Sequence, residues 1–158
     1  MSEPRLQKLQ YKNYLSAIKA LPQTNLFRHL YVADENGREF DATDDGDRSC
    51  ALAVTAVLYL AGWIDRPHAT VASTLKALAE SGWRKTESPR PGDIVHYPAG
   101  ESGDEHVGFW VRDDAVISNI SELRTPGEHK LMMSDGRLPM GYYTRDYGVD
   151  LEGEENEG

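Results

Sequence analysis

The run Cys50-Ala-Leu-Ala-Val-Thr-Ala-Val-Leu-Tyr-Leu-Ala-Gly62 decides the fold of this 158-residue chain. It is apolar on nearly every face, so as a helix it must lie inside the protein and not on its surface. The preceding loop, residues 41–49, is polar and offers several N-cap residues, and Gly62 is a typical helix end. The sequence therefore predicts a buried central helix that begins at Cys50.

Two further helices are expected around this one. Residues from about 4 to 21 place apolar side chains at roughly helical spacing, which predicts an amphipathic N-terminal helix. Residues 70–81 carry a second apolar stripe, with Thr70 as the expected N-cap and Gly82 as the stop.

Strand-like patterns flank and follow these helices. A small hairpin or an irregular arm is expected over residues 27–40, around the turn signal Asn36-Gly37. After Trp83, the alternation predicts short strands over 94–97, 106–112, 115–120, 130–133 and 140–145. Helices followed by strands predict an α+β fold, with an antiparallel sheet packed on the central helix.

A single domain is expected over residues 1–149, with the N-terminal helix and hairpin in 1–46 and the core in 47–149. Residues 150–158 alternate Glu and Gly, which predicts an acidic, disordered tail. The formal net charge of −9 argues against nucleic acid or an anionic membrane as a partner. A monomer is the default expectation.

The N-terminus lacks the charged start and apolar run of a secretory signal, and no apolar stretch approaches the ~20 residues that span a bilayer. The protein is therefore expected to be cytoplasmic as synthesised, with no membrane span, and to leave the cell only by a non-classical route.

Cys50 is the only cysteine, so it is either a small buried hydrophobe or a reactive thiol. At the first turn of a helix, unpaired backbone N–H groups and the helix dipole favour the thiolate, which predicts a lowered pKa for Cys50. The same N–H groups can donate to the oxyanion that forms when a thiolate attacks a carbonyl.

His106 opens the strand over 106–112, directly after a Gly-containing loop. A histidine there is by itself most often a surface or turn residue. A cysteine on a central helix and a histidine on the facing sheet, however, form the nucleophile and base of papain-like enzymes.

Three blocks resemble segments of the NlpC/P60 proteins, in the same order. Asp47-Arg-Ser-Cys-Ala-Leu-Ala-Val54 resembles their Asp-Cys-Ser-Gly-Leu-Val segment, although Ala51-Leu52 replaces Ser-Gly. Arg90-Pro-Gly-Asp-Ile-Val-His-Tyr97 resembles their Pro-Gly-Asp-Leu-Val strand, and His106-Val-Gly-Phe-Trp-Val111 resembles their His-Val-Gly-Ile-Tyr strand. The resemblance, to NlpC/P60 and CHAP amidases, implies a papain-like fold and a thiol protease or amidase that typically acts on the peptide part of cell-wall peptidoglycan.

The third catalytic residue is expected at Asn119. A hairpin through residues 112–114 brings the end of the strand over 115–120 beside His106, and an amide oxygen can accept from the imidazole N–H without carrying a charge. Residue count along the family pattern favours Ser118 instead, and strand alternation lets only one of the two reach the ring.

No metal or other cofactor is expected, because the other histidines lack metal-ligand spacing and one cysteine cannot form a Cys-rich zinc site. Each of these histidines is expected on the surface or in a turn: His29, His68, His96 and His129. Asp93 is expected to fix the turn before its strand by accepting from nearby backbone N–H groups.

These observations predict a cysteine hydrolase that forms an acyl-enzyme on Cys50, with His106 as base and then acid, and a peptide or a peptidoglycan stem peptide as substrate. Two alternatives stay open, because one fold can host several functions. The first is a catalytically silent domain that binds a peptide or a protein. The second is an intracellular thiol hydrolase or toxin that acts on an amide or ester outside the cell wall.

Overall fold

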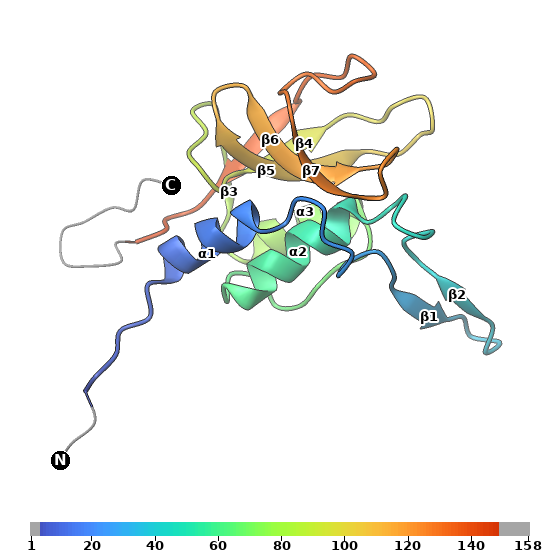
Figure 1. Ribbon diagram of the computed structural model, residues 1–158, viewed down its shortest axis with the longest axis horizontal. Coiled ribbons are helices and arrows are strands. Elements are labelled where there is room, and N and C mark those ends of the chain that lie inside the picture. Colours follow the sequence, from blue (N-terminus) through green and yellow to red (C-terminus); the bar gives the residue numbers. More distant parts are fainter. Residues whose placement is uncertain (1–3, 149–158) are drawn as a thin grey trace.

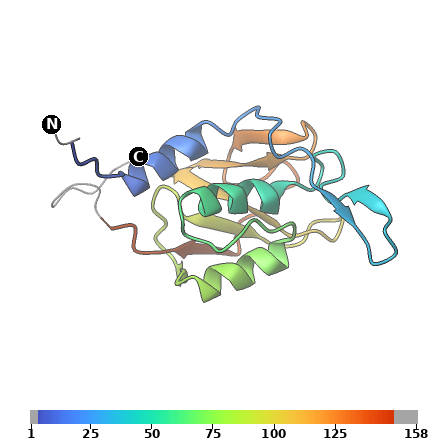
Figure 2. The ribbon, with the colours of Figure 1, turned by 90° about the horizontal axis from the view of Figure 1, so that it is seen from below.

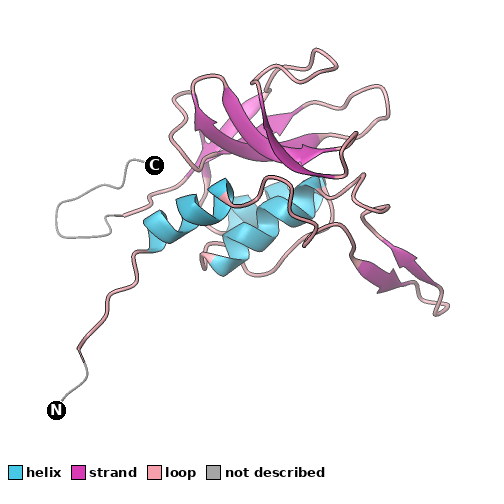
Figure 3. Cartoon of the chain, viewed as in Figure 1, coloured by secondary structure: helices cyan, strands magenta, loops and turns pink. Residues whose placement is uncertain are grey.

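The computed structural model describes residues 4–148, so the expected acidic tail lies outside the described residues. Within that range the chain has the expected α+β composition, with helices against one side of an antiparallel sheet (Figures 1 and 3). The helices are α1 (Gln10–Lys19), α2 (Cys50–Leu60) and α3 (Val71–Glu80). None of the helices in residues 4–148 combines the length and the apolar character that crossing a bilayer requires.

The main sheet has six strands in the order β3-β8-β4-β5-β6-β7, and each neighbouring pair is antiparallel. The strands are β3 (Arg84–Thr86), β4 (Ile94–Tyr97), β5 (His106–Arg112), β6 (Ala115–Ile120), β7 (Thr125–His129) and β8 (Gly141–Thr144). The strand expected over 130–133 is wrong, because the chain pairs with β6 over residues 125–129 instead. Strand β3 was not expected; it forms by pairing with β8.

A separate hairpin, β1 (Tyr31–Ala33) and β2 (Glu39–Asp41), projects from the body of the molecule (Figures 1 and 2). Its turn uses Gly37 at φ +80°, a left-handed conformation that glycine adopts without strain. The side chain of Asp34 accepts from the N–H groups of Asn36 and Arg38 and so closes the turn. The hairpin expected around Asn36-Gly37 is confirmed.

Helix α2 is buried as the sequence requires, from Ala51 to Leu58, and it packs against β5, β6 and the other two helices. It ends at Leu60, and Gly62, two residues later, has φ +78°. Helix α1 begins at Gln10, later than the residue near 4 that the periodicity predicts. For α3 the expected N-cap is confirmed, since the Thr70 side chain accepts from the N–H of Ser73.

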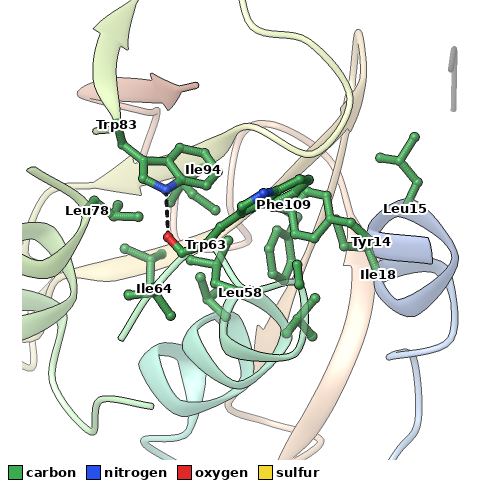
Figure 4. Close-up of a cluster of buried hydrophobic side chains, with 14 of the residues drawn as sticks. Tyr14, Leu15, Ile18, Leu58, Trp63, Ile64, Leu78, Trp83, Ile94 and Phe109 are labelled. Carbon is green, nitrogen blue, oxygen red and sulfur yellow. Dashed lines mark hydrogen bonds between the residues drawn. The ribbon is translucent and has the colours of Figure 1, made fainter. Parts of the chain in front are cut away.

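The main core lies between the helices and the sheet (Figure 4). In it, the indole N–H of Trp83 donates to the carbonyl of Trp63 at 3.3 Å, so the polar edge of this buried ring is satisfied. The core draws on all three helices and on the sheet, with members that include Tyr14, Ile18, Leu58, Leu78, Ile94, Val107, Phe109 and Ile117.

The two faces of the sheet bury different side chains, because residues alternate along a strand. We call the face toward the helices the helix face; Val107 and Ile117 point into its core. The opposite face, here the outer face, carries a smaller cluster around Tyr97 and Val116, against which Leu131 and Met133 pack. Residues of β5 and β6 adjacent to Val107 and Ile117, including His106 and Ser118, therefore belong to the outer face.

Candidate active site

The loop before α2 is built around Asp41. Its carboxylate accepts from the N–H groups of Leu30, Thr43 and Asp45 and from the ring of His29. Burial raises the pKa of Asp41, but the hydrogen bonds from His29 and from the backbone N–H groups outweigh this effect. They hold the pKa of Asp41 well below its usual range. The loop is thus folded around an ionised carboxylate.

Strand β6 and the turn after it tie this loop to the sheet. The Asn119 amide donates to the carbonyl of Gly46 at 2.8 Å, and the Ser121 hydroxyl donates to the carbonyl of Asp47 at 3.1 Å. The Arg124 guanidinium donates to the carbonyl of Asp44 at 3.0 Å. These bonds set the position from which the chain enters α2 at Cys50.

The backbone N–H groups of Val107 on β5, of Ala51 and of Cys50 itself act to lower the pKa of the Cys50 thiol. Burial nevertheless raises the pKa of the thiol, and the charge of Asp104 acts in the same direction. The lowered pKa expected from the helix N-terminus is therefore wrong, because desolvation of the sulfur outweighs the N–H donors. In this structure Cys50 is a neutral thiol.

His106 is buried on the outer face, with 7% of its surface exposed. Its Nε2 lies 2.8 Å from the hydroxyl of Ser118 on β6. Gly108 makes this approach possible, since a Cβ there would lie 2.7 Å from the Ser118 Cβ. Burial lowers the pKa of His106 to about 3, and the charges of His129 and Arg137 act in the same direction, so the ring is neutral near pH 7.

The Ser118 hydroxyl also contacts His129 on β7, whose Nε2 lies 2.6 Å away. The Nδ1 of His129 lies 2.7 Å from the carbonyl of Lys130, which can only accept, so Nδ1 carries the proton. Burial lowers the pKa of His129, and the neutral ring then accepts at Nε2 from Ser118. Ser118 in turn accepts from the Nε2–H of His106, which leaves the lone pair of His106 on Nδ1.

Cys50 packs against the core that includes Val107, the residue directly after His106 on β5. The backbone N–H of Val107 acts to lower the pKa of the Cys50 thiol. Cys50 approaches from the helix side, whereas the ring of His106 lies on the outer face. Within residues 4–148, no hydrogen bond joins the sulfur to the ring. Catalytic contacts are often long in a protein without substrate and tighten in the complex.

Arg137 holds the loops beside this site together. Its guanidinium donates to the carbonyls of Pro98 and Asp104 at 2.9 and 3.1 Å, and its Nε donates to the carboxylate of Asp135 at 2.9 Å. The loop between β4 and β5, which leads into His106, is thereby fixed to the segment between β7 and β8.

The structure reassigns the residues expected beside His106. Asn119 does not contact the ring; it lies on the helix face, 3% exposed, and its Oδ1 has no hydrogen-bond partner. Ser118, favoured by residue count, holds the ring instead. The sequence analysis missed His129 as a partner of Ser118. Ser118 pairs with Gly127 on β7, and His129 lies two residues after Gly127, on the same face of that strand.

Two more expectations can be compared with the structure. His96, expected on the surface or in a turn, is buried and lies 3.0 Å from the carboxylate of Glu105. Asp93 does fix its turn by accepting from the N–H of Arg90, and it also accepts from the hydroxyls of Thr144 and Tyr147.

In the part of the chain that the structure describes, no three His, Cys, Asp or Glu side chains are grouped as metal ligands. No protein-family model matches the sequence, and a comparison with curated proteins finds no match.

Proposed function

We propose that this protein is a cysteine-nucleophile amide hydrolase, with Cys50 as nucleophile and His106 as general base. One observation carries the proposal: the hydrogen-bond chain through Ser118 leaves Nδ1 of His106 free to accept a proton, one residue before Val107, whose backbone N–H acts on the Cys50 thiol. Acyl transfer by a cysteine needs a nearby base that a third group orients, and Ser118 orients His106.

The reaction starts from a neutral pair, since burial raises the pKa of Cys50 and lowers that of His106. As the sulfur attacks the amide carbonyl, the thiol proton passes to Nδ1 of His106 and a C–S bond forms. The backbone N–H groups of Cys50 and Ala51, in the first turn of α2, are the proposed donors to the oxyanion.

Collapse of the tetrahedral intermediate breaks the C–N bond, and the leaving amine takes the proton from His106. Water then attacks the thioester while His106 accepts one of its protons. The carboxylic acid product leaves, and the sulfur of Cys50 regains its proton.

The proposed substrate class is the peptide part of peptidoglycan. This proposal is supported by three sequence blocks that resemble segments of NlpC/P60 proteins. The blocks include the start of α2, strand β4 and strand β5. These blocks are separated in sequence but adjacent in space, since β4 pairs with β5 and α2 packs over β5.

The test is a digest of purified stem peptides, followed by mass spectrometry, with the wild type and Cys50→Ser compared. The serine keeps a small side chain but is a much weaker nucleophile. We expect new amine and carboxylate ends with the wild type alone. Binding of the peptides without any cleavage would contradict the proposal and identify a silent binding domain.

A further inference from the structure

His129 is not needed as nucleophile or base, yet its ring is tied to the site. It comes from β7, two strands from His106, and each of its ring nitrogens has a partner: Nδ1 the Lys130 carbonyl, Nε2 the Ser118 hydroxyl. The rings of His106 and His129 do not bond each other; their centroids are 6.5 Å apart. The hydrogen-bond connection between His129 and His106 therefore runs through the Ser118 hydroxyl.

We propose that His129 is a positioning residue: it orients the Ser118 hydroxyl so that His106 keeps its proton on Nε2 and its lone pair on Nδ1. This inference rests on the proposed role of His106 as base. The direction of the whole chain is set at its far end, because the Lys130 carbonyl can only accept and the Ser118 hydroxyl has a single proton to donate.

A substitution that removes the acceptor at position 129 no longer fixes which way the Ser118 hydroxyl donates. The Ser118 hydroxyl is then free to donate to Nε2 of His106, which favours the tautomer with its proton on Nδ1. This tautomer has no lone pair on the nitrogen that takes the thiol proton. The substitution therefore lowers the fraction of protein that is competent for catalysis without touching substrate.

Protonation of His129 has the same effect. The imidazolium donates from Nε2 to Ser118, and the hydroxyl proton turns toward His106. His129 is only partly buried, whereas His106 is 7% exposed, so desolvation opposes protonation of His129 less than that of His106. We therefore expect the acid limb of activity to follow His129.

Several other groups face this chain and share its electrostatic environment. The phenol of Tyr97 on β4 lies beside both rings, with centroids 5.8 Å from His106 and 6.4 Å from His129. Arg137 and Asp135 act on His106 with opposite sign. Charged groups also surround His129 in a surface hollow between β5, β6 and β7: Arg112, Asp113, Asp114, Glu128 and Lys130.

The test reads the tautomer of His106 by ¹⁵N NMR of protein with labelled histidine, in a Cys50→Ser background in which the proposed nucleophile is replaced. We expect the proton on Nε2 in this background protein. With His129→Phe added, we expect a shift toward the Nδ1–H form. His129→Gln should retain the original tautomer, since its amide oxygen replaces Nε2 as acceptor.

Turnover is measured on stem peptides with Cys50 intact. His129→Phe should lower kcat by about tenfold or more with KM nearly unchanged, and His129→Gln should recover most of the loss. An Nδ1–H tautomer in the background protein, or a tautomer that His129→Phe leaves unchanged, would overturn the inference. If the tautomers behave as expected but the wild type cleaves nothing, the proposed function fails, whereas the control of the His106 tautomer by His129 stands.

Discussion

Burial of His106 predicts that the folded protein loses stability in acid. The folded ring has a pKa of about 3, whereas a histidine in an unfolded chain titrates near 6.5. Between these two values the unfolded chain binds a proton that the folded chain does not. The contribution of the buried, neutral His106 ring to stability is therefore fully present above pH ~6.5 and is lost as the pH falls toward ~3.

The magnitude follows from the two pKa values. Each pH unit inside this window removes about 1.4 kcal/mol per group, so lowering the pH from ~6.5 to ~4.5 removes about 3 kcal/mol. That is a large share of the ~5–15 kcal/mol by which a domain is usually stable.

The assay is urea unfolding at about pH 7 and about pH 4.5, for the wild type and for His106→Gln. The variant lacks the titrating ring, so its loss of unfolding free energy should be smaller by about 3 kcal/mol. His129→Gln, measured in parallel, isolates the contribution of the second buried ring. Equal losses in the wild type and His106→Gln would refute the burial argument.

Three further predictions concern the candidate site. Because burial raises the pKa of Cys50, its alkylation by iodoacetamide should accelerate only above the ordinary thiol pKa of ~8.5, and a plateau already reached below that pH would contradict the structure. Ser118→Ala should lower kcat by about tenfold or more, because the hydroxyl that holds His106 is lost. Asn119→Ala should have the smaller effect on kcat and should cost about 1 kcal/mol of stability through the lost bond to Gly46. Similar kcat losses in the two variants would speak against Ser118 as the residue that orients His106. Gly108→Ala should lower both kcat and Tm, since its Cβ displaces Ser118, and the control Gly141→Ala, where nothing lies within 4 Å, should leave both near the wild-type values.

The helices were predictable because their signals are local. The apolar run that begins at Cys50 requires burial whatever its partners are, and Thr70 caps its helix through a bond to Ser73, three residues away. Helix α1 starts late because residues 4–9 contribute little to the core: they are exposed or only partly buried, so the periodicity around Leu6 leads to no packing.

The arrangement around His106 was only partly predictable, because it depends on pairing between strands. The β5–β6 hairpin places both Ser118 and Asn119 near the ring, but the face that each occupies follows from the register, with Phe109 opposite Ile117. That register puts Ser118 on the outer face with His106.

His129 was missed for a related reason. Its strand was expected over 130–133, and only the pairing of Ser118 with Gly127 shows that the side chain two residues later can reach the hydroxyl. The pKa of Cys50 was predicted with the wrong sign because the helix N-terminus is a local signal, whereas burial of the sulfur depends on the sheet packed against it.

Mass spectrometry of the Cys50 peptide, after a brief reaction with stem peptides and an acid quench, tests the nucleophile most directly. We expect a thioester adduct of the acyl fragment on Cys50, greatly reduced in His106→Ala, and no cleavage by Cys50→Ala. Cleavage by Cys50→Ala at the wild-type rate would rule out Cys50 as the nucleophile.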